Sequence, residues 1–119
     1  MKKVLHITVS KDWKADMRAD FKAIAAGKHE NAPTYGLSFT SVGLLFRKLT
    51  ENRWNLVREL IGQAPMSIRG IARFVEREQR RVFDDVKALG ELGLLEKNDD
   101  NLWYCPYDDI HIDMHLAAA

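Results

Sequence analysis

Basic side chains, with one glutamine, gather on one predicted helix, on the segment before it and on the hairpin that follows. The set consists of Arg69, Arg73, Arg77, Gln79, Arg80, Arg81, Lys87 and Lys97. Arginine donates paired hydrogen bonds to guanine and to phosphate, glutamine matches the edge of adenine, and lysine brings a point charge to phosphate. These eight side chains are therefore candidate contacts to double-stranded DNA, provided that the fold presents them on one surface.

Three short helices are predicted between residues 50 and 93. Thr50 is an N-cap for the first, which carries an apolar stripe that includes Trp54 and Val57. Ser67 caps the second, and the third spans about residues 78–91 and is ended by Gly93. Two helices joined by a short turn place the second one where it can enter a major groove.

The third helix has one buried and one exposed face. Val82, Val86 and Leu89 recur at the spacing of an inward stripe. At 100° per residue, the side chains that project to the opposite side are Arg77, Arg80, Asp84, Lys87 and Glu91, with Arg81 on one flank and Gln79 and Phe83 on the other. The exposed face is thus richest in arginine toward its start, and Asp85 is placed to pair with Arg81 four residues earlier.

A β-hairpin is predicted after the third helix. Residues 94–97 and 102–105 form its two strands, around the polar turn 98–101. Lys97 is the single cation in this hairpin, and Asp99 and Asp100 lie at its tip. We therefore expect the main contact to nucleic acid to come from the helix rather than from the hairpin.

The segment before the three helices predicts further strands and helices. Residues 3–9 alternate as a short strand, a helix is expected over 10–27, and residues 28–36 are expected to form a polar loop. Residues 37–39 would finish a short strand. Thr40 or Ser41 then caps a helix whose apolar face carries Val42, Leu45, Phe46 and Leu49.

Residues 109–116 alternate apolar and polar side chains, which predicts an edge strand or a strand shared between subunits. Its polar side carries Asp109, His111, Asp113 and His115, a set with metal-ligating chemistry. Side chains along one strand can share a single ion only with help from another strand or subunit. The same pattern is also typical of the solvent-exposed face of an amphipathic strand. We expect no metal site, and keep a metal-responsive role of His111 and His115 as an alternative.

Charge and composition narrow the classes of function. The net charge of the 119 residues is +1, but residues 1–42 carry +3, residues 43–90 carry +4 and residues 91–119 carry −6. A basic body with an acidic tail is expected where one surface faces phosphate. No apolar run approaches the roughly 18 residues that span a bilayer. The single cysteine, Cys105, fits a reducing cytoplasm rather than a disulfide framework.

No arrangement for catalysis is recognisable in the sequence. It contains no serine or cysteine nucleophile with a matched histidine, no glycine-rich phosphate loop and no metalloprotease-type histidine pair. No cofactor is implied either. We expect a protein that is not an enzyme.

Several strings within residues 37–116 resemble one known pattern. They are Leu49-Thr50-Glu51-Asn52-Arg53, Ser67-Ile68-Arg69-Gly70-Ile71-Ala72, Arg81-Val82-Phe83-Asp84-Asp85-Val86-Lys87-Ala88-Leu89, Leu92-Gly93-Leu94-Leu95 and Cys105-Pro106-Tyr107-Asp108. With the terminal strand, they resemble winged helix-turn-helix regulators of the MarR and ArsR kind. They also resemble small DNA-binding proteins that are encoded beside a toxin, as in TumE/TumA-type toxin–antitoxin pairs. The resemblance implies an antitoxin that represses its own operon and binds its toxin.

These observations predict an α+β fold with a winged helix-turn-helix core. We expect an N-terminal strand–helix extension over residues 1–36, the DNA-binding domain over 37–107, and a C-terminal strand and tail over 108–119. The first or the last strand should help to build a homodimer, which doubles the contacts to an operator. The expected function is that of a dimeric transcriptional repressor. The alternatives are a winged helix used only for protein interaction, and a metal- or ligand-responsive regulator.

Overall fold

The computed structural model describes residues 3–9 and 34–114. Helices and strands are both present, so the architecture is mixed α+β. The chain divides into two compact units, one made of residues 1–47 and 109–119 and the other of residues 48–108. None of the described helices is long and apolar enough to cross a membrane.

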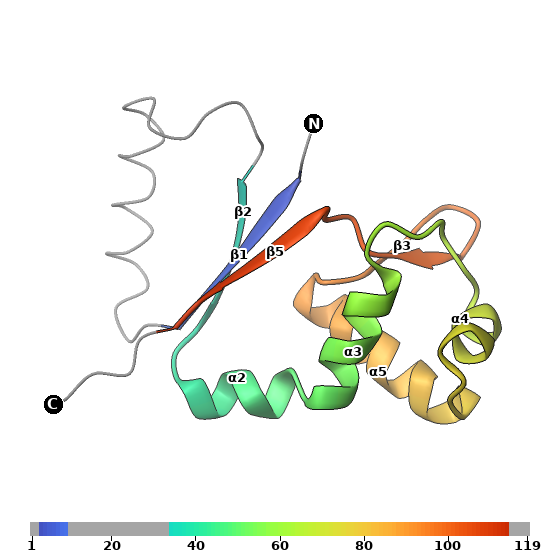
Figure 1. The fold of residues 1–119 in the computed structure, drawn as a ribbon, viewed down its shortest axis with the longest axis horizontal. Coiled ribbons are helices and arrows are strands. Elements are labelled where there is room, and N and C mark those ends of the chain that lie inside the picture. Colours follow the sequence, from blue (N-terminus) through green and yellow to red (C-terminus); the bar gives the residue numbers. More distant parts are fainter. Residues whose placement is uncertain (1–2, 10–33, 115–119) are drawn as a thin grey trace, which may run out of the picture. The chain divides into compact units, whose positions relative to one another are not determined.

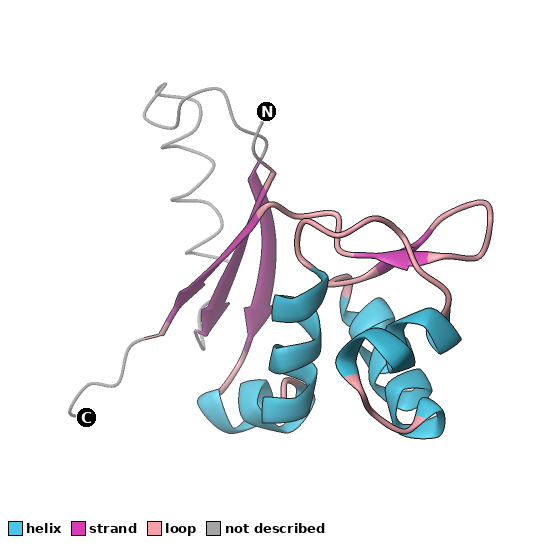
Figure 2. Ribbon diagram, turned by 45° about the vertical axis from the view of Figure 1, so that its right-hand side comes forward, coloured by secondary structure: helices cyan, strands magenta, loops and turns pink. Residues whose placement is uncertain are grey.

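Three parallel strands form the sheet of the first unit. The strand β1 (Val4–Val9) lies in the centre, with β2 (Thr34–Phe39) on one side and β5 (Asp109–Asp113) on the other (Figures 1 and 2). The register places His6 of β1 opposite Gly36 of β2 and His111 of β5. Because β1 is central, both of its hydrogen-bonding edges are occupied, and β2 and β5 are the edges of this sheet.

The two faces of the sheet differ in polarity. Side chains alternate along a strand, so Leu5 and Ile7, which are 3% and 0% exposed, share one face with the buried Phe39. On the opposite face, the hydroxyl oxygens of Thr8 and Ser38 are 2.9 Å apart. The alternation predicted for residues 3–9 is thus confirmed, and it buries the apolar side of β1.

The strand β2 begins inside the segment expected to be a loop. Residues 34–36 are held in β2 by parallel pairing with β1, so the loop predicted over residues 28–36 does not extend that far. Residues 37–47 belong to the same unit as the sheet, whereas the sequence suggests a boundary after residue 36. The helix expected over residues 10–27 lies outside the described residues.

The helix α2 (Val42–Lys48) follows β2. Ser41 Oγ accepts a hydrogen bond from the Leu44 N–H at 3.1 Å, so Ser41 acts as the cap. Leu45 is the buried residue of this helix, but Phe46, predicted on the same inward face, is 56% exposed. The face of α2 that is buried is therefore narrower than the face that carries apolar residues.

Three helices and a hairpin make up the second unit. In chain order they are α3 (Glu51–Leu60), α4 (Ile68–Val75), α5 (Gln79–Leu92), β3 (Glu96–Lys97) and β4 (Trp103–Tyr104) (Figure 1). Side-chain oxygens of Thr50 and Ser67 accept hydrogen bonds from the backbone N–H groups of Arg53 and Gly70. Gly93 ends α5 in the left-handed region at φ 84°. The three predicted helices and their caps are confirmed.

The hairpin is shorter than predicted and pairs with a third backbone segment. Leu94 and Leu95, expected to begin the first strand, are instead buried residues that precede β3. Met66, just before α4, donates its N–H to the Trp103 carbonyl at 2.9 Å and accepts the Trp103 N–H at 2.7 Å. This pair of hydrogen bonds joins the start of α4 to the hairpin.

An inward stripe on α5 sets the rotation of that helix. Val82, Val86 and Leu89 are each 0% exposed, as their spacing predicts. Burial of each such side chain contributes about 1.5–3 kcal/mol relative to an exposed position. Gln79, Arg80 and Arg81, which precede this stripe, and Lys87, which lies within it, are exposed, so α5 presents four of the eight candidate DNA contacts to solvent.

Candidate nucleic-acid interface

Gln79, Arg80 and Arg81 form the start of α5 and are exposed. Because Val82 is fully buried, the residues just before it project away from the core of the unit. The side chains of Arg80 and Arg81 are 79% and 77% exposed. The structure thus places both arginines in solvent in the first turn of the helix.

Each of these two arginines has an acidic partner close in sequence. Arg80 Nε lies 3.8 Å from Asp84 Oδ1, and Arg81 Nε lies 3.6 Å from Glu78 Oε2. Exposed ion pairs of this kind contribute about 0.2–1 kcal/mol. A phosphate group or a guanine edge would therefore displace these carboxylates from the guanidinium groups at little cost.

Arg77 stands apart from the exposed set. Its Nη2 lies 2.7 Å from Asp85 Oδ2, and Asp85 Oδ1 lies 3.2 Å from Arg53 Nε. The Asp85 side chain is 15% exposed, and the two arginine side chains are about a quarter exposed. The predicted pair between Asp85 and Arg81 is wrong, because Asp85 lies at the margin of the buried face of α5. There it meets arginines from α3 and from the turn before α5.

The Asp85 cluster connects three parts of the second unit. Besides its bond to Asp85, Arg53 donates from Nη1 to the Lys48 carbonyl at 2.8 Å. The carboxylate thereby holds the start of α3 and the turn before α5 against α5 itself. Sequence reasoning missed this cluster, since Arg53 and Asp85 are 32 positions apart. The sequence feature that could have indicated the cluster is the position of Asp85 directly beside the buried apolar stripe of α5.

The helix α4 adds two more exposed arginines, Arg69 and Arg73. Its inward side carries the buried Ile71 and Ala72. Residues 76–78 connect it to α5, with Glu76 in the left-handed conformation at φ 57°. The helices α4 and α5 are in contact, so they form a packed pair joined by a tight turn.

Lys87 and Lys97 border an open hollow between α5 and the hairpin, which Trp103 also lines. Lys97 Nζ lies 5.8 Å from the centroid of the Trp103 ring, and Lys87 Nζ lies 5.5 Å from the centroid of the Phe83 ring. Both lysines are exposed. Their stems cover apolar surface while their ammonium groups remain in water, where they can contact phosphate. Glu91 and Glu96 also line this hollow, so its two ammonium groups are matched by two carboxylates.

Gly90 brings the hairpin close to α5. A Cβ added at Gly90 would lie 2.9 Å from Cζ3 of Trp103 and 3.1 Å from its Cη2, so the indole ring packs directly on the helix backbone. This contact fixes Lys97 relative to Lys87. Sequence reasoning missed the role of Gly90. Its signal is a glycine inside a 14-residue helix, where glycine is about 1 kcal/mol less favourable than alanine.

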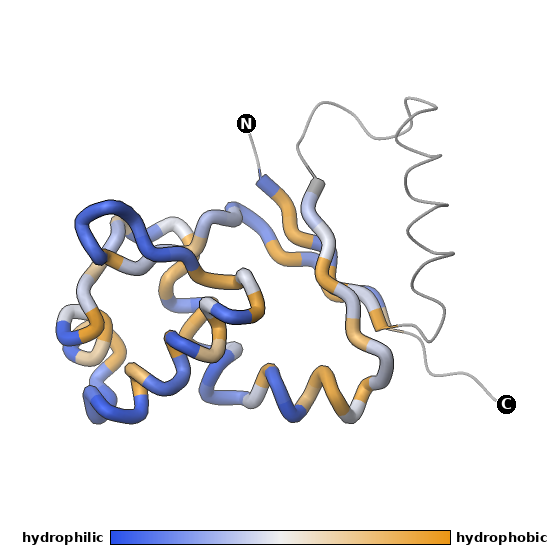
Figure 3. Tube along the Cα trace, turned by 180° about the vertical axis from the view of Figure 1, so that it is seen from behind, coloured by the Kyte–Doolittle hydropathy of each residue, from blue (hydrophilic) through white to orange (hydrophobic). Residues whose placement is uncertain are grey.

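The tip of the hairpin is acidic, and the loop between β3 and β4 is hydrophilic (Figure 3). Asp99 and Asp100 are exposed there. Asn98 Oδ1 shapes the loop by accepting the N–H groups of Asp100 at 2.9 Å and Leu102 at 3.0 Å. The exposed carboxylates would repel a phosphate backbone, so this tip is less suited to the contact than the start of α5.

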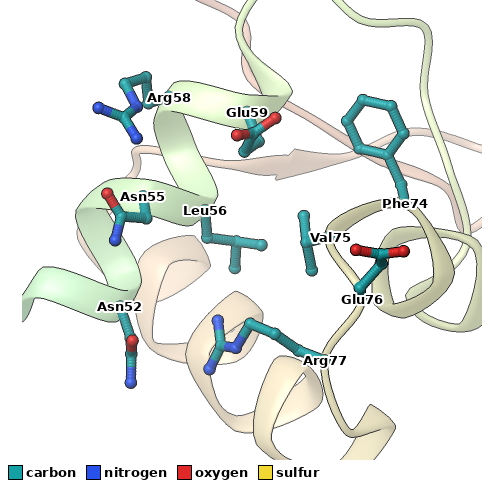
Figure 4. Close-up of a pocket in the computed structure, with 9 residues that line it drawn as sticks. All are labelled: Asn52, Asn55, Leu56, Arg58, Glu59, Phe74, Val75, Glu76 and Arg77. Carbon is teal, nitrogen blue, oxygen red and sulfur yellow. The ribbon is translucent and has the colours of Figure 1, made fainter.

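A separate open groove lies between α3 and the end of α4 (Figure 4). It has a volume of about 370 Å³, and its lining includes Arg58 and Glu59 of α3, Phe74 of α4, and Glu76 and Arg77. Two guanidinium and two carboxylate groups balance in this groove, which gives it no net preference for an anion. Neither Arg80 nor Arg81 lines it.

The candidate metal ligands at the end of the chain are placed only in part. Asp109, His111 and Asp113 lie on β5 and are exposed, whereas His115 lies outside the described residues. Within residues 3–9 and 34–114, no group of three or more histidine, cysteine, aspartate or glutamate side chains is placed to hold one ion.

A family model named HVO_A0114 matches residues 48–112, which is more than half of the chain. The chain belongs to the HVO_A0114 family. The matched residues include the whole second unit and most of β5, and therefore every candidate DNA contact described above. No curated protein and no solved structure matches the chain.

Proposed function

We propose that residues 48–108 form a winged helix-turn-helix unit that binds double-stranded DNA, and that the protein regulates transcription. The observation that carries this proposal is the exposure of Arg80 and Arg81 in the first turn of α5, directly beside the buried Val82. In a helix-turn-helix, the second helix enters the major groove and its N-terminal residues contact the base edges.

The order of elements supports this architecture. The pair α4 and α5 with its tight turn corresponds to the two helices of the motif, and α3 packs against α5. The strands β3 and β4, with the bridge from Met66, correspond to the small sheet of a winged helix. The acidic tip of the hairpin leaves the recognition of bases to α5, with Lys97 as a contact to phosphate.

We further propose that the protein acts as a homodimer that represses its own operon. Two copies double the contacts to phosphate, and a two-fold axis matches a palindromic operator. Ile112 and Met114, at the β5 edge of the sheet, are 42% and 41% exposed, and exposed apolar side chains at a sheet edge favour contact with a partner. The resemblance to antitoxin-type regulators makes a small toxin the first protein to test as a further partner.

The test compares matched variants in a titration of labelled operator-length duplex DNA, followed by fluorescence anisotropy. Arg80→Ala and Arg81→Ala should each lower the affinity, by roughly 1–3 kcal/mol if they contact bases. Asp84→Asn should raise it, because Arg80 is then released from its carboxylate partner. Arg47→Ala, which removes an exposed cation from the other unit, is the control and should have little effect.

Unchanged affinity in both α5 arginine variants would overturn the assignment of α5 as the recognition helix. A second candidate function, a winged helix that binds only proteins, is favoured by the acidic tip at Asp99 and Asp100 and by the acidic partners of the α5 arginines. That candidate predicts no binding of the wild type to any duplex.

A further inference from the structure

Two histidines from opposite ends of the chain lie side by side on the sheet of the first unit. His6 of the central strand β1 and His111 of the edge strand β5 are register partners, and their ring centroids are 5.3 Å apart. The sequence gives no hint of this pair, because the residues are more than a hundred positions apart and meet only through the parallel pairing of β1 with β5.

The pair lies on the polar face of the sheet. Leu5 and Ile7, the neighbours of His6 along β1, point to the opposite, buried face. Asp109 and Asp113 are two positions before and after His111, so they share its face. Two carboxylates beside two imidazole rings make this face attractive to a cation, and imidazole selects transition metals over calcium or magnesium.

The separation of the two rings matches a shared ion. An imidazole nitrogen binds zinc at about 2.0–2.1 Å, which places the ion about 3.2 Å from the ring centroid. Two rings that share one tetrahedral ion then have centroids about 5.2 Å apart. The observed distance of 5.3 Å meets this requirement, and coordination further requires that one nitrogen of each ring faces the ion.

Among the residues that the structure describes, the surroundings of the pair leave room for the ion and its remaining ligands. His111 is exposed and His6 is half-buried, so both are open to solvent on one side. On the other side of His6, its register partner on β2 is Gly36, and no atom of the described residues lies within 4 Å of the position that a Cβ would take there. Water molecules can therefore complete the coordination.

We propose that His6 and His111 bind one divalent transition-metal ion of the zinc, nickel or copper class. The ion exchanges two of its water molecules for one nitrogen of each imidazole, both in the neutral form. Bound in this way, it links the first strand of the chain to the last described strand. A link that closes so long a stretch of chain favours the folded state of the sheet. This function is separate from the binding of DNA and does not depend on it.

The thiol of Cys105 does not compete for this role. It is buried in the second unit, its Sγ lies 3.7 Å from the Tyr107 carbonyl, and burial raises its pKa, so the thiolate that a metal requires is disfavoured. The remaining histidines of the chain are His29 and His115. They serve as internal controls, because each replacement removes one imidazole and leaves both members of the pair in the chain.

The test is a zinc titration by calorimetry of the full chain without a histidine tag, after treatment with a chelator. The wild type should bind one ion per chain. Removal of one ligand should weaken binding by at least the roughly 10–100-fold that is seen for loss of a supporting residue. We expect this loss in His6→Gln and His111→Gln, and no change in His29→Gln and His115→Gln.

Thermal unfolding gives the second readout. Zinc should raise the Tm of the wild type and of both controls, and should leave the Tm of the two pair variants unchanged. Because His6 lies in the central strand, His111→Gln at the exposed edge is the deciding variant if His6→Gln folds poorly. Absence of binding by the wild type, or an equal loss in a control variant, would overturn the proposal.

Discussion

Replacement of Asp85 should destabilise the second unit far more than replacement of its neighbour Asp84. The carboxylate of Asp85 accepts from Arg77 at 2.7 Å and from Arg53 at 3.2 Å, and it is 15% exposed. Asp84 is 60% exposed and has one ion pair at 3.8 Å. The two aspartates are adjacent on the same helix, so they share helix propensity and charge and differ in their partners.

The magnitude follows from the two charged hydrogen bonds. Each is worth about 1.5–3 kcal/mol when it is well shielded. Arg53 and Arg77 are about a quarter exposed, so water would replace part of the interaction in the variant. We therefore expect Asp85→Ala to lower the free energy of unfolding by about 2–3 kcal/mol, and Asp84→Ala to change it by no more than about 0.5 kcal/mol.

Urea unfolding followed by circular dichroism measures both variants. In a unit of this size 1 kcal/mol corresponds to about 4–8 °C, so Asp85→Ala should also lose roughly 10–20 °C in Tm. A double-mutant cycle with Arg77→Ala should give a coupling energy of about 1 kcal/mol or more. Equal stability of Asp85→Ala and Asp84→Ala would show that the cluster contributes nothing beyond an ordinary surface ion pair, contrary to this prediction.

Three further outcomes are expected. Val86→Ala should lower the free energy of unfolding by roughly 1–3 kcal/mol through a core cavity, and a wild-type denaturation midpoint would show that the rotation of α5 is wrong. Gly90→Ala should destabilise by about 1–3 kcal/mol because its Cβ would meet Trp103, whereas Gly43→Ala in α2, where the nearest atom is 4.0 Å away, should be neutral or stabilising in the same unfolding assay. Because the pKa of the Cys105 thiol is raised in the folded protein, its contribution to the free energy of unfolding is complete below its ordinary pKa of 9.0 and is lost as pH rises through the folded value. The free energy of unfolding should therefore fall between pH 8 and pH 10, and it should fall less in Cys105→Ala than in the wild type. An identical fall in both proteins would contradict this.

The helices of the second unit are predictable from the sequence because their signals are local. Thr50 and Ser67 mark the starts of two helices, Gly93 marks the end of a third, and the apolar spacing on α5 fixes which side is buried. Exposure of Arg80 and Arg81 follows from that spacing alone.

The position of Arg77 could not be predicted from the periodicity of α5. Projection at 100° per residue applies only inside a helix, and α5 begins at Gln79, so the direction of Arg77 is set by the turn. Its partner Asp85 is eight positions away, and Arg53 comes from another helix. Such contacts depend on how helices pack, which no pattern within one helix contains.

For the sheet of the first unit, individual strands could be predicted from the sequence, but their pairing and register could not. The alternation in residues 3–9 and 109–113 identifies β1 and β5, but neither strand contains information on its partner or register. Parallel strands have no hairpin turn to fix their pairing. The meeting of His6 with His111 is consequently visible only in the structure.

We propose above all that this member of the HVO_A0114 family binds DNA through α5. The most direct test is a titration of the purified protein against its own upstream DNA at two salt concentrations, with an unrelated duplex as competitor. We predict preferential binding to the upstream DNA that weakens steeply as salt rises, because several phosphate contacts release counterions. Absence of binding, or equal binding to both duplexes, would contradict it.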